Sequence, residues 1–236
     1  MYRKVHCFFE QSGTFKNEIK KLGGIALDYD ILNDFNETDN VIDLYNEIEK
    51  AYLDLSSIFN KIDTKDLIIA FFPCVRFEDQ IRLMYQGTNK ILQNRDDIYK
   101  LQNDLYYHKS LSKNYELVTK LAIICLKRKI PLIIENPYSK VHYLTQYWCL
   151  KPKIIDMDRT LNGDCFKKPT QYFFIGLEPK QNMVLDPITF VKTKRINEIN
   201  GFQKDGIVER SMIEPQYAER FLKMYVCDYV DDKYII

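Results

Sequence analysis

Two short apolar runs constrain the fold of this chain more than any other feature. Residues 66–72 (DLIIAFF) and 131–135 (PLIIE) are almost wholly apolar, and a run of this length is typical of a strand covered on both faces of a sheet. Further strands are predicted at residues 4–9, 25–27, 41–43, 153–156 and 171–176, and helices at residues 15–22, 44–52, 115–128, 138–150 and 215–226. Strands alternating with helices predict an α/β fold with a doubly wound sheet.

Composition supports one globular unit. The 236 residues are 46% hydrophobic, enough to bury a core within a single domain at residues 1–236. Residues 76–129 are charged and helical in pattern, which predicts an insertion after the fourth strand, whereas residues 177–209 are polar and turn-rich. Neither an apolar stretch long enough to span a membrane nor a signal segment is visible, so we expect a cytoplasmic protein.

Charge and cysteine content exclude some classes of function. The net charge of +1 gives no global field for non-specific nucleic-acid binding, so any such contact requires a local patch. The six cysteines include no Cys-x-x-Cys pair, and we expect no metal site.

Polar groups follow the predicted strands where ligands bind in open α/β sheets. They are the turn Glu10–Thr14, the acids Asp28, Asp30 and Asp43, the pair Pro73–Cys74, and the run Glu135–Pro137. The turn after the first strand holds a single glycine, Gly13, and is a poor match to the dinucleotide-binding fingerprint. We therefore expect a ligand that carries a nucleoside but no pyrophosphate.

Cys74 is the strongest candidate for chemistry. A thiol on a loop at the carboxyl edge of a sheet, fixed by the preceding proline, is suited to attack an electron-poor ring carbon. Glu135 follows another strand on the same edge and is placed to exchange a proton with a heterocycle. The alternative is that Cys74 is a small buried residue at a strand end.

In order along almost the whole chain, these residues resemble the cytosine-C5 DNA methyltransferases. Residues 7–23 look like the family's first motif, Asp28 or Asp30 takes the place of the acid that binds the cofactor ribose, and Asp43–Leu44 resembles the pair that contacts adenine. Residues 210–218 resemble the last motif, which closes the cofactor pocket. The resemblance implies a Rossmann-like fold that binds S-adenosylmethionine through Phe9, Glu10, Gln11, Ser12, Gly13, Thr14, Phe15, Asp28, Tyr29, Asp30, Asp43, Leu44, Phe72 and Ser211.

The same resemblance implies a catalytic role for two motifs. Residues 66–77 are similar to the stretch that ends in the family's proline–cysteine pair, which places Cys74 on the nucleophile, and residues 132–137 look like the motif that places Glu135 on the cytosine-binding glutamate. Pro73, Asn136 and Pro137 would contact the base. The thiolate would attack C6 of a cytosine flipped out of DNA, and Arg76 is one candidate for the positive potential that the thiolate needs.

Two other functions stay open. The unusual turn Glu10–Ser12, together with Lys167 and Lys168 as the basic residues that stand where the family has an arginine-rich segment, is compatible with a binding protein of the same fold that has no turnover. A methyltransferase acting on RNA or a free nucleotide would not need a recognition region larger than residues 177–209. If DNA is the substrate, either a partner protein supplies specificity or the basic residues of the helical insertion contact the nucleic acid.

Overall fold

A seven-stranded sheet forms the centre of the molecule. The computed structural model describes residues 2–193 and 212–228, and its strands follow the order β3-β2-β1-β4-β5-β7-β6. β7 runs antiparallel to its neighbours β5 and β6, while the other pairs are parallel. The bounds are β1 Val5–Phe8, β2 Ala26–Asp30, β3 Asn40–Val41, β4 Leu67–Phe71, β5 Leu132–Pro137, β6 Ile154–Asp156 and β7 Thr170–Ile175.

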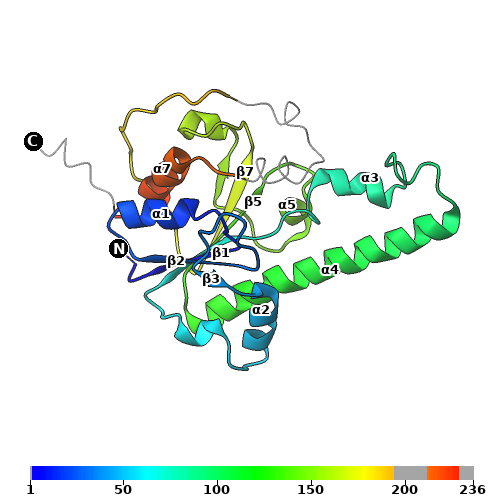
Figure 1. Cartoon of the computed structure of the whole chain (residues 1–236), viewed down its shortest axis with the longest axis horizontal. Coiled ribbons are helices and arrows are strands. Elements are labelled where there is room, and N and C mark those ends of the chain that lie inside the picture. Colours follow the sequence, from blue (N-terminus) through cyan, green and yellow to red (C-terminus); the bar gives the residue numbers. More distant parts are fainter. Residues whose placement is uncertain (1, 194–211, 229–236) are drawn as a thin grey trace, which may run out of the picture.

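Helices cover both faces of this sheet (Figure 1). α1 (Thr14–Lys21) and α7 (Pro215–Tyr225) pack together on one face, whereas α2 (Leu44–Tyr52) and the second half of α4 (Asp97–Arg128) pack on the other. The strands alternate accordingly: Leu67 and Ile69 join the core under α1 and α7, while Ile68 and Ala70 join the core over α2 and α4. Both faces are apolar because both are covered, which confirms the predicted α/β class and the doubly wound layering.

α4 continues as an arm beyond the sheet (Figure 1). Its 32 residues span about 48 Å at the α-helical rise. Leu117, Val118 and Leu121 are fully buried, whereas Ile98, Leu101 and Leu105 are exposed on the outer half. Only the inner half packs on the sheet, and the short helix α3 (Arg82–Tyr85) lies beside the outer half.

Most predicted elements are present, and two helices differ. The helix predicted at 115–128 begins eighteen residues earlier, at Asp97, where the Asp96 side chain accepts a hydrogen bond from the Tyr99 amide. The helix predicted at 138–150 is reduced to α5 (Tyr143–Tyr147) because the backbone is extended on both sides, at His142 and Trp148. Three short 3-10 helices, Ile58–Lys61, Asp79–Ile81 and Arg159–Asn162, lie in segments where no helical turn was separately predicted.

The second half of the chain contains one long segment without regular structure. Between β7 and α7, residues 177–193 form no helix or strand, and residues 194–209 of the predicted recognition region lie outside the described residues. Within the described ranges, the structure contains no helix with the length and apolar character needed to cross a bilayer.

Candidate functional site

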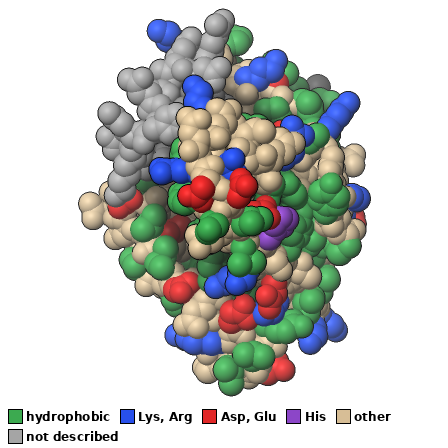
Figure 2. All heavy atoms as spheres, turned by 90° about the vertical axis from the view of Figure 1, so that its right-hand side faces the viewer, with side chains coloured by type: hydrophobic (Ala, Val, Ile, Leu, Met, Phe, Trp, Pro, Cys, Tyr) green, Lys and Arg blue, Asp and Glu red, His purple; other side chains and the backbone are tan. Residues whose placement is uncertain are grey.

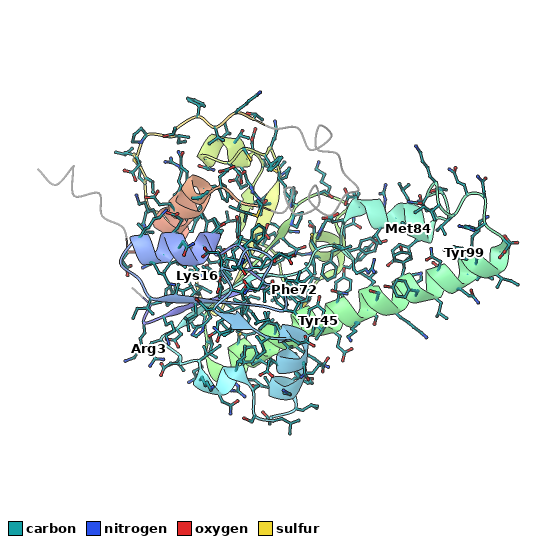
Figure 3. The ribbon with its side chains drawn as sticks, in the orientation of Figure 1. Arg3, Lys16, Tyr45, Phe72, Met84 and Tyr99 are labelled. Atoms are coloured by element: carbon teal, nitrogen blue, oxygen red, sulfur yellow. The ribbon has the colours of Figure 1, made fainter. Side chains whose placement is uncertain are left out.

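A cleft of about 240 Å³ opens at the carboxyl edge of β1, β2, β4 and β5. The predicted site residues that line it are Phe9, Glu10, Gln11, Ser12, Thr14, Phe15, Asp30, Phe72, Pro73, Cys74, Glu135 and Pro137. Phe35, Phe71, Val75, Arg159, Lys168, Met212 and Ile213 also line it but were not among the predicted site residues. Figure 3 shows Phe72 close to Tyr45 at the end of the sheet that faces the arm, and their ring centroids are 6.2 Å apart. The fold therefore brings the predicted cofactor-binding turn and the predicted catalytic pair into one cleft.

The turn between β1 and α1 is held by the Glu10 carboxylate. Its two oxygens accept hydrogen bonds from the amides of Phe15, at 2.6 Å, and Lys16, at 3.3 Å. The first amides of a helix have no hydrogen-bond partner within the helix, and the Glu10 carboxylate binds two of these amides in α1. Gly13, with φ of 67°, occupies the N-cap position, and the Thr14 side chain makes no capping hydrogen bond.

The backbone of this turn is conformationally unusual at the cleft. Phe9, a non-glycine residue, has φ of 59°, and its amide donates to the Tyr29 carbonyl at 2.8 Å. Left-handed backbone at a bulky residue is strained and needs support from the surrounding structure. Gly13 does not line the cleft, since a side chain there would point toward Lys16 and Glu37.

Burial changes the ionisation of Glu10. The side chain is only 5% exposed, and burial raises its pKa to about 7, against the opposing effect of the two amide hydrogen bonds. A carboxyl group in this range is partly protonated at neutral pH.

Of the two acids proposed for the ribose, Asp30 faces the cleft and Asp28 does not. Asp28 is fully buried, pairs with the Lys16 ammonium at 2.9 Å, and accepts the Asp39 amide at 2.6 Å. These contacts hold the loop after β2 against α1. Asp30 lines the cleft, and its carboxylate accepts the Leu32 amide at 2.8 Å.

Several other predicted cofactor contacts have structural roles outside the cleft. Tyr29 is buried and its hydroxyl hydrogen-bonds His6 at 2.9 Å. Asp43 caps α2 by accepting the amides of Tyr45 and Asn46, and Leu44 is buried in the core. Ser211 lies outside the described residues, although the neighbouring Met212 and Ile213 line the cleft.

The loop that carries Cys74 is fixed from two sides. The Asn136 side-chain amide donates to the Phe72 carbonyl at 2.7 Å, and the Phe77 amide donates to the Cys74 carbonyl at 2.7 Å. Asn136 is fully buried, so it positions the loop instead of contacting a base in the cleft. The half-buried Cys74 thiol donates a hydrogen bond to Glu78 Oε1 at 3.0 Å.

The Arg76 side chain is bound to α4. Its guanidinium donates to Ser110 Oγ at 2.8 Å and to the Tyr106 hydroxyl at 3.1 Å, and it lies 5.0 Å from the ring centroid of Tyr107. These partners are all on α4, and stacking with the aromatic rings accounts for the orientation. The assistance of Arg76 to the nucleophile stays a prediction, and in this structure the guanidinium is held against α4.

Among the described residues that line the cleft, Lys168 and Arg159 carry positive charge. The Lys168 charge lowers the pKa of both Cys74 and Glu135, but burial outweighs it and the pKa of each is raised, that of Cys74 far above its ordinary value. Arg159 is 1% exposed, forms a buried ion pair with Asp164, and lies 5.0 Å from the Tyr217 ring centroid. Sequence reasoning missed Arg159 because nothing in its spacing distinguishes a buried arginine from a surface one.

Glu135 presents a buried carboxyl group to the cleft. The residue is 9% exposed, and none of the described residues donates a hydrogen bond to its carboxylate. Burial raises its pKa, while Lys168 and then Arg159 act in the opposite direction. A buried polar group without a protein partner is a candidate to bind a ligand.

The interpretation of this site rests on the geometry of its residues. No family model matches the chain, and no match was found among the curated proteins.

Proposed function

We propose that the protein transfers a methyl group from S-adenosylmethionine to C5 of cytosine, with DNA as the expected substrate, through a covalent adduct on Cys74. One observation carries the proposal: the β1–α1 turn and Asp30 line the same cleft as Cys74 and Glu135. A cofactor on one side would then face a base on the other, as a direct transfer requires.

The cofactor side of the cleft fits a nucleoside that has no phosphate. Asp30 offers a carboxylate to a ribose diol, and Phe9, Phe35 and Phe72 offer aromatic surface. The Glu10 carboxylate already binds the α1 amides that would otherwise hold a phosphate. S-adenosylmethionine supplies an electrophilic methyl group on a sulfonium, whose positive charge suits a wall that carries Glu10 and Asp30.

The substrate side fits nucleophilic attack on a pyrimidine. Sulfur of Cys74 would bond to C6 and the ring electrons would shift to C5, which takes the methyl group. Loss of the C5 proton and cleavage of the S–C6 bond then restore the ring. Because burial raises the pKa of Glu135, its protonated form is favoured, and a neutral carboxyl group donates a hydrogen bond to the ring nitrogen as charge develops there.

The test is incorporation of labelled methyl groups from S-adenosylmethionine into DNA, RNA and free nucleotides in parallel. We expect incorporation into DNA that falls by at least about a thousandfold in Cys74→Ala, with Cys149→Ala as the control because Cys149 is an exposed cysteine. Incorporation that survives Cys74→Ala would overturn the nucleophile assignment. Incorporation into RNA or nucleotides alone would replace DNA as the substrate.

A second candidate is a binding protein that keeps the fold without turnover. It is favoured by the strongly raised pKa of Cys74 and by the orientation of Arg76 toward α4, which leave the thiol protonated at rest. Calorimetry with S-adenosylmethionine and trapping on 5-fluorocytosine DNA separate the two. Binding without a covalent adduct supports the second candidate, and an adduct that Cys74→Ser abolishes excludes it.

A further inference from the structure

Glu78 makes the direct contact with the proposed nucleophile. Its Oε1 accepts the hydrogen bond of the Cys74 thiol at 3.0 Å. Cys74 lines the cleft, where the carboxyl group of Glu135, which receives no hydrogen bond from the described residues, also indicates a ligand site. The Cys74 proton therefore already lies on a hydrogen bond to a carboxylate at the point where chemistry is expected.

The fold holds Glu78 in this position. The hydrogen bond from the Phe77 amide to the Cys74 carbonyl closes a turn that returns the chain toward the thiol. Phe77 is fully buried, and its carbonyl accepts the Tyr143 amide at 3.0 Å. On the other side of Glu78, the Asp79 carboxylate accepts the Ser139 hydroxyl at 2.7 Å. Glu78 is thus fixed between two anchored residues.

We propose that Glu78 is a catalytic residue, the base that takes the proton of Cys74 as the sulfur–carbon bond forms. The identity of the electrophile rests on the proposed function, whereas the proton transfer itself does not. As sulfur bonds to C6, its proton moves to Glu78 Oε1. When the S–C6 bond breaks after methylation, its electron pair returns to sulfur and Glu78 returns the proton.

Transfer of the proton to Glu78 lets Cys74 react although the cleft disfavours a free thiolate. Burial and then the Glu78 charge raise the pKa of Cys74, and the Lys168 charge only partly offsets them, with Glu135 also raising it. His142, whose pKa is affected by both Asp79 and Glu78, is a further titratable group beside this pair. A thiol that is protonated at rest gains reactivity when a base accepts its proton during the reaction.

The experiment measures the rate at which acrylamide alkylates Cys74, followed by mass spectrometry of the Cys74 peptide. In the wild type, the rate is expected to be nearly independent of pH between about 6 and 8, because Glu78 accepts the proton. In Glu78→Gln the thiol must first ionise to solvent, so the rate is expected to rise about tenfold per pH unit below the thiol pKa.

Two further variants control the measurement. Asp79→Asn removes a neighbouring charge but keeps a side-chain oxygen that accepts the anchoring Ser139 hydroxyl bond, so it is expected to keep the wild-type profile. Glu78→Asp keeps a carboxylate and should retain part of the flat profile, which separates loss of the base from loss of folding. A wild-type rate as steep with pH as that of Glu78→Gln would overturn the inference.

The alkylation uses no cofactor or nucleic acid, so its result tests the role of Glu78 independently of the proposed function. A flat wild-type profile together with no 5-fluorocytosine adduct rejects the methyltransferase and keeps the role of Glu78. An adduct that forms at the wild-type rate in Glu78→Gln rejects the role of Glu78 and keeps the methyltransferase.

Discussion

At the residue scale, the acidic groups around the β1–α1 turn differ in what binds them. Asp28 is neutralised by Lys16, Glu10 is bound by two amides, and Asp30 is bound by one amide at the cleft. Buried charges need such partners, because desolvation otherwise favours their neutral forms. Asp28, which pairs with a cation, has a structural role, while Glu10 and Asp30, which no described cation pairs with, line the cleft.

The raised pKa of Glu10 predicts a pH-dependent stability. Between the ordinary value of 4.5 and the folded value of about 7, the folded protein holds a proton that the unfolded chain has lost. The contribution of Glu10 to the unfolding free energy therefore falls as pH rises through this window. Relative to Glu10→Gln, which has no such titration, we expect a loss of about 3 kcal/mol between pH 4.5 and 7.

Urea unfolding of both proteins at several pH values tests this prediction. The lowered pKa of His142, about 4, makes an opposite contribution, in which stability falls as pH falls toward 4. It is present in both proteins and cancels in the difference. A difference that stays constant between pH 4.5 and 7 would contradict the shift at Glu10.

A site residue could be predicted from the sequence when its position relative to a strand was enough to place it in the cleft. Asp30 is the last residue of β2, Glu135 lies in the second half of β5, and Cys74 follows β4 by three residues. The topology brings these positions to a common edge, and all three line the cleft. Tyr29 lies on the opposite face of β2 from Asp30 and hydrogen-bonds His6. Asp28 shares the face of Asp30 but lies further inside the strand, where it is fully buried and pairs with Lys16. Arg159 and Glu78 pair with residues only five and four positions away, Asp164 and Cys74. These pairs form in loops and tight turns, where the sequence has no periodic pattern that predicts side-chain direction.

At the element scale, α4 has two halves with different environments. The inner half was predicted because apolar residues at helical spacing signal a face packed on a sheet. The outer half gave no such signal, since it packs on little besides α3 and carries exposed leucines. Likewise, the antiparallel direction of β7 leaves no trace in a short apolar run, so strand existence was predictable and strand direction was not.

Two leucine substitutions on α4 test this division. Leu121 is fully buried and Leu101 is 69% exposed. We expect Leu121→Ala to lower the unfolding free energy by about 2–5 kcal/mol, because it leaves a cavity between helix and sheet. Leu101→Ala, the matched control, should change it by less than about 0.5 kcal/mol. Equal effects in urea unfolding would show that the outer half is packed against other parts of the protein.

At the scale of the whole molecule, the cleft lies at the carboxyl edge of the sheet, and the arm formed by the outer half of α4 extends beyond the same edge. The carboxyl edge of the sheet faces the side from which α4 extends, and Figure 2, which views the molecule from that side, shows Lys, Arg, Asp and Glu side chains interspersed with apolar ones. Among the described residues, this mixture of charges forms no continuous basic surface on this face for a nucleic-acid backbone. The proposed DNA substrate therefore depends on the cleft and on a partner or local contacts for its positioning.

The same architecture predicts which ligands stabilise the whole protein. A ligand that binds only the folded state at a hundred times its dissociation constant adds about 2.7 kcal/mol to the unfolding free energy. We expect thermal shifts with S-adenosylmethionine and with adenosine at high concentration, and none with NAD or AMP, because Glu10 occupies the α1 amides that would bind their phosphates. Glu10→Ala frees those amides and should allow AMP to stabilise the protein. If NAD or AMP stabilises the wild type as strongly as S-adenosylmethionine does, the cleft is a phosphate-binding site and the assignment of Glu10 is wrong.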